Sequence, residues 1–361
     1  MTRHFPVLPV SDIQALAVIP IGGSPDWVAV DEEGVWISNK EECNVSLISP
    51  QSNSLVRQVA MDGHPCSGLA CGFGSIWAPT CDPGSLVRLD GRSGATTARI
   101  ELQVSDSEGG LAVDDFGVWI VSESSDALLR IDPLTNHIAG RITIDDGSHV
   151  VVSGDGKLWT SSSLRNRVTC IDPATGRVEG VISVGPQPRF MCCSLDSLWV
   201  LNQGDGSVSR IGFAERRVVA SVEVGVPGRG GDIDFGHNSI WVTAIDTPLT
   251  RIDAESGRVI VQYTGRGGDA LRTGFGSVWL SSFILQEVWR IDPGVCLPSS
   301  SPMVNRGHLP SAAVPATSLT GSGEDWEGMF DALTDAKGRV GRHSAAPVDP
   351  SVIWAEDEGY D

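Results

Sequence analysis

Short stretches of apolar or alternating apolar and polar residues recur along this chain, separated by turns rich in Gly, Asp, Asn and Ser. The clearest unit is a short apolar strand, a turn that usually contains Gly, and then an aliphatic residue followed by Trp. Runs of this length between tight turns predict β-strands joined in hairpins. Seven copies of the unit read AVDEEGVWIS, ACGFGSIWAP, AVDDFGVWIV, VSGDGKLWTS, CSLDSLWVLN, DFGHNSIWVT and TGFGSVWLSS.

The unit repeats at a nearly constant interval. Its tryptophans lie 41, 42, 40, 40, 42 and 38 residues apart and are Trp36, Trp77, Trp119, Trp159, Trp199, Trp241 and Trp279. A third strand follows in most copies, as in ALLRID (127–132), and a fourth follows a turn such as PATGR (173–177). Four short strands in about 41 residues are typical of a propeller blade. The sequence therefore predicts an all-β fold, a seven-bladed β-propeller with four-stranded blades, over residues 13–293.

The ring of blades must also close. Stacked blades cover each other's faces, and we expect the repeated Trp to fill the space between them. The last copy ends at RIDP (290–293) without a fourth strand, whereas ALAVIPIGGSP (15–25) matches the fourth strand VEGVISVGPQP (178–188). We therefore expect residues 15–21 to pair with residues 286–292, so that the N-terminal strand closes the last blade and removes an open edge.

After Pro293 the composition changes. Residues 294–323 are rich in Ser and Pro, and the end of the chain is acidic. The sequence predicts a flexible, disordered acidic tail over 294–361, with a possible short helix at 324–336 that could bind a protein partner.

Composition narrows the function. The formal net charge of −19 argues against nucleic acid and against an anionic membrane surface as partners. No apolar run of 18 residues and no secretory leader is visible, so a cytoplasmic location is expected. Among the eight cysteines, Cys66 and Cys81 match facing strand ends within disulfide range, but a reduced pair is expected in that compartment.

The G-x-P start, the recurring Gly-x-x-Trp strand and the R-I-D-P-x-T-G-R turn resemble streptogramin lyases and the wider YVTN-type and NHL-type propellers. The resemblance covers residues 13–293. It implies a magnesium-assisted elimination that opens a cyclic depsipeptide, with a catalytic histidine in a P-H-[AG]-I motif and a glutamate four residues after the repeat Trp. This chain has no P-H pair at a strand start, and its Trp motifs read WISN, WAPT, WIVS, WTSS, WVLN, WVTA and WLSS.

The family geometry places two sets of residues at one mouth of the central channel, because the start and end of a hairpin lie side by side. The first set, about ten residues before each Trp, is Asp26, Cys66 or Ser67, Gly109 or Gly110, His149, Arg189, Asp232 and Asp269. The second set, four residues after each Trp, is Lys40, Cys81, Glu123, Ser163, Gln203, Ile245 and Phe283. We expect Asp26, Lys40, Arg189, Gln203 and Phe283 to contact a ligand.

Two groups within these sets suggest chemistry. His149 and Glu123 match the family's catalytic positions on adjacent blades and form a candidate acid–base pair; the alternative is a histidine satisfied by a backbone carbonyl. Asp26, Asp232 and Asp269 form a candidate site for Mg²⁺ or Ca²⁺. The alternative is pairing with basic residues, Asp26 with Lys40 and the other two with Arg229, Arg266 or Arg189.

Two functions follow from these expectations. One is a streptogramin-lyase-like propeller that binds, and cleaves or rearranges, a small cyclic or peptidic metabolite at the channel mouth, as a carbon–oxygen lyase or a hydrolase. The other is a non-catalytic propeller that binds a ligand or a protein. The pattern of residues leaves both open.

Overall fold

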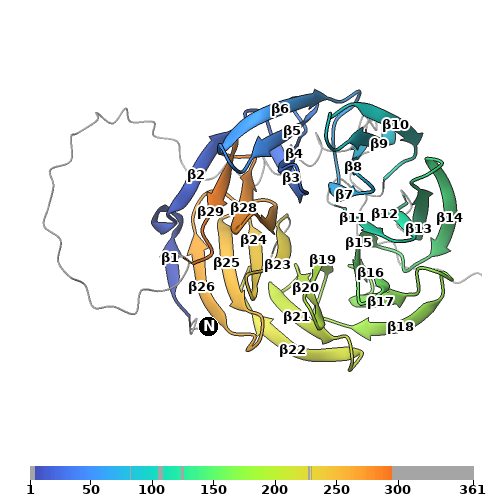
Figure 1. Ribbon diagram of the computed structural model, residues 1–361. Coiled ribbons are helices and arrows are strands. Elements are labelled where there is room, and N and C mark those ends of the chain that lie inside the picture. The colour runs from blue at the N-terminus through green and yellow to red at the C-terminus, as the bar shows by residue number, and fades with distance from the viewer. Residues whose placement is uncertain are drawn as a thin grey trace, which may run out of the picture. The chain divides into compact units, whose positions relative to one another are not determined.

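The computed structural model describes residues 5–81, 83–104, 109–122, 126–226, 228 and 230–294. These residues form seven antiparallel sheets arranged as a ring, with the first strand of each sheet nearest the centre and the last at the rim (Figure 1). The predicted seven-bladed β-propeller is therefore confirmed. Among the described residues, no helix is long and apolar enough to cross a membrane.

The blades follow one another in chain order. Their strands are, for blade 1, β3 (Pro25–Val30), β4 (Val35–Asn39), β5 (Asn44–Ser49) and β6 (Ser54–Ala60); for blade 2, β7 (Ala70–Gly72), β8 (Ser75–Cys81), β9 (Gly84–Asp90) and β10 (Thr96–Glu101); for blade 3, β11 (Leu111–Asp114), β12 (Gly117–Val121), β13 (Ala127–Asp132) and β14 (His137–Thr143). Blade 4 has β15 (Ser148–Gly154), β16 (Lys157–Ser162), β17 (Arg167–Ile171) and β18 (Val178–Ser183); blade 5 has β19 (Pro188–Cys193), β20 (Ser197–Asn202), β21 (Ser207–Gly212) and β22 (Arg217–Glu223). Blade 6 has β23 (Asp232–Gly236), β24 (Ser239–Ala244), β25 (Thr247–Asp253) and β26 (Val259–Thr264); blade 7 has β27 (Leu271–Gly274), β28 (Ser277–Ser282), β29 (Glu287–Ile291) and β2 (Ala15–Pro20).

The N-terminal segment closes the ring as predicted. Strand β2 pairs antiparallel with β29, with Ala15 opposite Ile291 and Pro20 opposite Glu287. The sequence did not predict that β1 (Val7–Pro9) would pair in parallel with β26 and give blade 6 a fifth strand. Sheet structure therefore begins before residue 13, and the first twenty residues bind two adjacent blades.

The seven repeat tryptophans are buried, as expected: each is at most 1% exposed. Each indole N–H donates a hydrogen bond to an acceptor five residues earlier, over 2.8 to 3.2 Å. The acceptor is a carbonyl, a hydroxyl or, at Asp31 and Asp114, a carboxylate. Because the polar atom of each buried ring is satisfied, the ring contributes its full apolar area to the core, and truncation to Ala typically costs about 3–5 kcal/mol.

Arginines on the third strands of four blades join each of them to the next blade. In blade 7, the Arg290 guanidinium lies 5.1 Å from the centroid of the Trp279 ring, and its Nε donates to Ser277 over 2.9 Å. Its Nη1 donates to the Pro50 carbonyl (2.5 Å) and to Asn53 Oδ1 (2.7 Å) in blade 1. The same arrangement recurs in blades 2, 5 and 6 with Arg88, Arg210 and Arg251.

The junction between blades 4 and 5 reverses this arrangement. Cys170 lies opposite Trp159, at the position where five other blades carry an arginine and blade 1 carries Leu47. Arg216, from the turn of blade 5, instead reaches back, lies 5.8 Å over the Trp159 ring and donates to Cys170 Sγ over 3.0 Å. A cation over the tryptophan is thus retained although it comes from the opposite side.

Tight turns join the first two strands of several blades. Asp155 and Gly156 both have positive φ, of 54° and 66°, which is the backbone of a two-residue type I′ turn. Phe73 and Gly74 repeat it, with φ of 53° and 64°. The glycine in these turns is the residue that adopts such a conformation at no steric cost.

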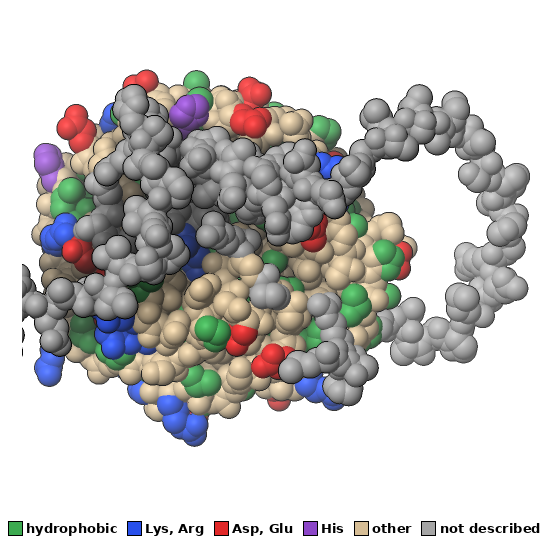
Figure 2. All heavy atoms as spheres, turned by 180° about the vertical axis from the view of Figure 1, so that it is seen from behind, with side chains coloured by type: hydrophobic (Ala, Val, Ile, Leu, Met, Phe, Trp, Pro, Cys, Tyr) green, Lys and Arg blue, Asp and Glu red, His purple; other side chains and the backbone are tan. Residues whose placement is uncertain are grey.

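On the face of the molecule seen in Figure 2, hydrophobic side chains are scattered among acidic and basic ones. The predicted flexible tail, including the helix at 324–336, lies outside the described residues except for Gly294.

Candidate functional site

Three first strands carry a β-bulge at the mouth, the end of the ring where the first strand of each blade begins and the second ends. The ladders shift register over Asp26 and Trp27 in β3, at His149 in β15, and over Arg189 and Phe190 in β19. A bulge adds one residue to a strand and re-aims its side chains, and bulges are frequent next to active sites. Three predicted site residues, from blades 1, 4 and 5, therefore share one local structure.

Trp27 and Phe190 meet although their blades are not neighbours. Their ring centroids lie 5.7 Å apart with the planes inclined by 56°, and the two side chains are 3% and 2% exposed. Blade 1 contacts blades 2 and 7, and blade 5 contacts blades 4 and 6, so this aromatic pair spans the axis of the ring. Trp27 directly follows Asp26 in β3, and Phe190 directly follows Arg189 in β19, so both rings lie next to mouth residues. We call Trp27 and Phe190 the aromatic floor.

Asp232 and Asp234 on β23 connect blade 6 to blade 7. The Asp232 carboxylate forms an ion pair with Arg272 and accepts a hydrogen bond from the backbone N–H of Leu271 over 3.2 Å. Thr273 donates to Asp234 from its backbone N–H (2.7 Å) and from its hydroxyl (2.8 Å). Burial raises the pKa of Asp232 to about 6, although the Arg272 charge acts in the opposite direction. Asp232 is therefore part of a buried bridge between blades.

The predicted cation site is not assembled in this structure. Within the described ranges, no group of three or more His, Cys, Asp and Glu side chains is arranged to hold a metal ion. Asp232 has Arg272 as its ionic partner, a residue that the sequence argument did not consider. Asp26 and Asp269 are buried, each 5% exposed. The ion pair with Arg272 makes Asp232 a poor ligand for a cation in this arrangement, and binding of Mg²⁺ or Ca²⁺ by Asp26, Asp232 and Asp269 stays a prediction.

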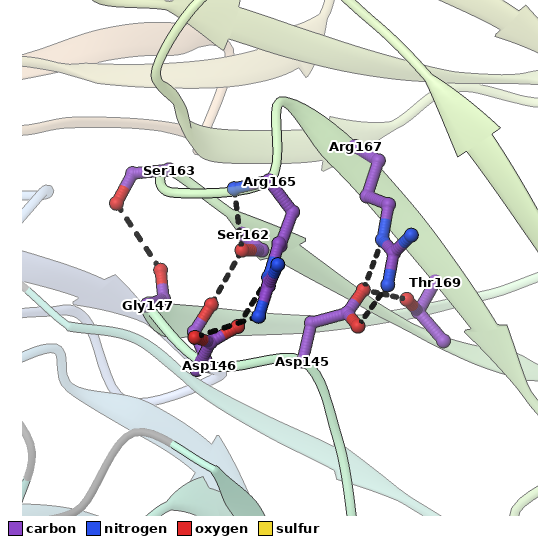
Figure 3. A network of polar contacts seen from close by, with 8 residues as sticks. All are labelled: Asp145, Asp146, Gly147, Ser162, Ser163, Arg165, Arg167 and Thr169. Atoms are coloured by element: carbon purple, nitrogen blue, oxygen red, sulfur yellow. Dashed lines mark hydrogen bonds and ion pairs between the residues drawn. The ribbon is translucent and has the colours of Figure 1, made fainter. Parts of the chain in front are cut away.

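His149 is half-buried and is fixed at its backbone. Its carbonyl accepts a hydrogen bond from the N–H of Gly110 in blade 3 over 3.1 Å. The loop before it, residues 145–147, is bound to the loop between β16 and β17 (Figure 3). There the Gly147 carbonyl accepts from both the N–H (3.0 Å) and the hydroxyl (3.2 Å) of Ser163. Ser163 is one of the predicted mouth positions. In this structure it binds Gly147, which lies two residues before His149 in the chain.

Two arginine–aspartate pairs strengthen this loop (Figure 3). Arg165 donates to the two carboxylate oxygens of Asp146 over 2.6 and 3.1 Å. Arg167 binds Asp145 in the same bidentate geometry, over 2.7 and 2.5 Å, and the Thr169 hydroxyl donates a third hydrogen bond to that carboxylate. These hydrogen bonds hold the pKa of both carboxyl groups below the usual range. The segment that leads into His149 is therefore positioned by charge-assisted hydrogen bonds.

The other residues predicted to contact a ligand lie at the mouth ends of their strands, and their contacts with a ligand stay predictions. Gln203 donates from Nε2 to the Gly230 carbonyl over 3.0 Å and so contacts the loop that enters blade 6. Lys40 and Phe283 are half-buried at the mouth ends of their blades. Glu123, the proposed partner of His149, lies outside the described residues. The acid–base pair therefore stays a prediction.

The expectation of a reduced cysteine pair in blade 2 is wrong in this structure. Cys66 and Cys81 form a disulfide, with their Cα atoms 5.8 Å apart. The strand positions already allowed the bond, and the sequence argument rejected it only because of the expected compartment. The bond ties the segment that precedes β7 to the end of β8 at the mouth.

One groove lies away from the mouth. It has a volume of about 420 Å³ and is lined mainly by β18 together with Cys170 and Arg216. Its charged residues are already engaged with each other, since Arg216 contacts both Cys170 (3.0 Å) and Glu179 (3.9 Å). The groove therefore follows from the reversed junction between blades 4 and 5.

The geometry defines a seven-bladed propeller whose mouth carries Asp26, His149 and Arg189 around an aromatic floor. A solved propeller described as a streptogramin B lyase structure has a similar fold, with a TM-score of 0.65 and 17% sequence identity. The match covers 76% of this chain and 97% of that one. No family model matches the chain, and no curated protein matches it. At this identity the likeness shows the shared fold.

Sequence reasoning missed the aromatic floor and Arg272. A signal was present: nine residues before the repeat Trp, five blades carry Gly, Val, Asp or Ala, whereas blades 1 and 5 carry Trp27 and Phe190. Two bulky rings at a position that is otherwise small or polar indicate that they fill a shared space. Blades 3 and 4 approach each other closely at this position, because a Cβ added to Gly110 would lie 3.1 Å from a methyl group of Val150.

Proposed function

We propose that the protein binds a small cyclic or peptidic metabolite at the mouth, over the aromatic floor. The observation that carries this proposal is the set of three bulges, at which Asp26, His149 and Arg189 lie at one end of the ring of blades. Trp27 and Phe190 contact each other across the axis of this ring. Charged groups around an apolar base suit a ligand with both polar and apolar parts. The buried hydroxyl of Ser148, beside His149, has no hydrogen-bond partner among the described residues, and a ligand or water that accepts from it would satisfy it.

A catalytic version of this function is favoured by the position of His149. Its imidazole is half-buried, its backbone is held by Gly110, and the loop before it is fixed by two ion pairs. A histidine placed in this way can transfer a proton near neutral pH. In an elimination like that of streptogramin lyases, His149 would remove a proton from the carbon adjacent to the one that bears the leaving oxygen. A carbon–carbon double bond would form as the carbon–oxygen bond breaks, and the ring would open without water being added.

One experiment tests both versions. A cyclic depsipeptide of the streptogramin B class is titrated into the full-length protein by calorimetry, and the mixture is then analysed by mass spectrometry. Elimination opens the ring without a change in mass, whereas hydrolysis adds one water. We expect His149→Ala to weaken binding by about 10–100-fold if the side chain makes a charge-assisted hydrogen bond to the ligand. If the protein is an enzyme, we expect turnover to fall by about 10²–10⁴-fold.

A matched control separates the site from the fold. His237 is exposed in the turn between β23 and β24, at the end of the blade opposite the mouth. His237→Ala should leave binding and turnover unchanged. If the depsipeptide and linear peptides of similar size leave the heat signal flat, the metabolite proposal is rejected. The alternative of a non-catalytic propeller that binds a protein, including one recognised by the tail, then takes its place.

A further inference from the structure

Two loops at the mouth place a thiol against an imidazole. Cys43 lies in the turn between β4 and β5, and His64 lies in the segment that leads from β6 to β7. Cys43 Sγ is 3.2 Å from His64 Nδ1. His64 is exposed and Cys43 is half-buried, so small molecules in solution can reach the pair. Neither residue belongs to the ligand site proposed above.

The surroundings decide which atom carries the proton. The carbonyl oxygen of Lys40 lies 3.1 Å from the same Nδ1 of His64. A carbonyl oxygen only accepts hydrogen bonds, so this contact requires a proton on Nδ1. That N–H is shared between the carbonyl and the sulfur of Cys43. The sulfur of Cys43 also lies 3.7 Å from the same Lys40 carbonyl. The imidazole N–H is therefore placed to donate to this sulfur when the sulfur acts as a nucleophile.

The charged groups around this pair come from both loops. The turn contributes Lys40, Glu41 and Glu42, and the facing segment contributes Asp62. Asp62 is already paired with Arg99, at 3.7 Å. Both loops that hold the pair therefore carry charged residues close to it in the sequence.

The other free cysteines of the described ranges lack these features. Burial raises the pKa of Cys193 to about 12 and raises the pKa of Cys71, Cys170 and Cys192 as well. Buried thiols of this kind are protonated near neutral pH and react slowly. Cys66 and Cys81 are joined to each other. Among the described residues, the combination of exposure and an imidazole partner is therefore found at Cys43.

We propose that Cys43 is a site of covalent modification that exchanges with small-molecule disulfides, with His64 as the partner of its thiolate. The thiol first gives up its proton, and His64 is held as the imidazolium. The thiolate then attacks one sulfur of the small disulfide R–S–S–R. A bond forms between Cys43 and that sulfur, the S–S bond of the reagent breaks, and R–S⁻ leaves and takes a proton from His64 or from water.

The test uses 5,5′-dithiobis(2-nitrobenzoate), a small aromatic disulfide whose leaving thiolate is coloured. The full-length protein carries Cys296→Ser, because Cys296 lies outside the described residues and would add its own signal. At pH 7 we expect one thiol to react rapidly in the native protein. Cys43→Ser should remove this phase, and His64→Gln should slow it by about tenfold, since an ordinary thiol is only a few per cent ionised at this pH.

A pH profile separates a role in ionisation from a merely structural one. Below pH 8, the rate for His64→Gln should fall by about tenfold per pH unit, as for an ordinary thiol. The rate for the parent protein should change much less between pH 6 and 8. The proposal is overturned if Cys43→Ser keeps the rapid phase, if His64→Gln reacts as fast as the parent, or if thiols react only after unfolding in guanidinium. The total of thiols in guanidinium serves as the control for intact protein.

Discussion

Replacing Ile19 by Ala tests how strongly the N-terminal strand closes the ring. Ile19 lies on β2 opposite Val288 of blade 7 and is 3% exposed within the main core. Removing three carbons from such a site leaves a cavity and typically costs about 2–5 kcal/mol. In a domain of this size, that loss lowers the melting temperature by roughly 5 to 15 °C.

The same strand offers a matched control. Leu16 lies on β2 and is 53% exposed, and Leu16→Ala removes the same number of carbons. Because this side chain is half in water already, we expect a loss of about 0.5–1 kcal/mol at most. The two variants share the strand, the number of carbons removed and the new residue. Leu16 lies at the bulge between Ala15 and Ala17 whereas Ile19 lies opposite Val288, and the main difference between the sites is burial at the closure.

The assay is urea unfolding followed by tryptophan fluorescence, with thermal unfolding as a second measurement. A lower midpoint at constant slope would show that stability has changed without a change in the unfolded surface. We also expect Ile19→Ala to aggregate earlier on heating, because loosening β2 exposes the edge of β29. Equal shifts for the two variants, or none for Ile19→Ala, would mean that the N-terminal strand is dispensable and that the ring is held elsewhere.

Four further outcomes are expected. Arg290→Ala should cost about 1–3 kcal/mol in urea unfolding, because it loses its bonds to blade 1 and its stacking on Trp279, and Arg290→Lys should recover only part of this. Bonding to Lys157 lowers the pKa of Asp172 to about 2; its contribution is therefore complete above about pH 4 and lost as pH falls toward 2, and Asp172→Asn should weaken the protein at pH 7 more than at pH 2. The pKa of Asp232 is raised to about 6, so its effect on stability has the opposite sign, because between pH 4 and 6 the folded state binds more protons than the unfolded state. The wild type should therefore gain stability relative to Asp232→Asn as pH falls from 7 to 5. A loss of stability relative to Asp232→Asn over this range would contradict burial as the cause of the raised pKa. Millimolar Mg²⁺ or Ca²⁺ should leave the melting temperature unchanged, and a rise would instead reveal a cation site outside the predicted carboxylates.

The repeat made the architecture predictable. A Trp at nearly constant spacing identified seven blades, and the missing fourth strand after Arg290 identified the partner of residues 15–21. Both inferences use local patterns that recur in each blade, so a poor match to the pattern in one copy is offset by the other copies. Strand β1 was not predicted, because the three residues that pair in parallel with β26 show no periodic pattern of their own.

The site was less predictable because its contacts are made between copies of the repeat. Position within a blade placed His149 and Arg189 near the start of the inner strand, where the structure has a bulge in each case, but it does not tell which blades face each other across the axis. The partners of Trp27 and Asp232 come from other blades, and no pattern inside one repeat specifies them. The disulfide of Cys66 was missed for another reason, since a compartment inferred from composition outweighed a geometry that the repeat had given correctly.

The doubly attached N-terminal segment has a consequence for how the chain folds. Residues 7–20 are synthesised early, yet their partners β26 and β29 are synthesised only after most of the propeller. These contacts join the ends of the propeller and have the largest sequence separation among the strand pairings of the described residues, which places them among the slowest to form. Until then β2 is an apolar strand without a neighbour, in a nascent chain whose earlier blades can already stack. Ring closure should therefore be the late, committing step of folding, and the moment at which this protein depends most on protection from aggregation.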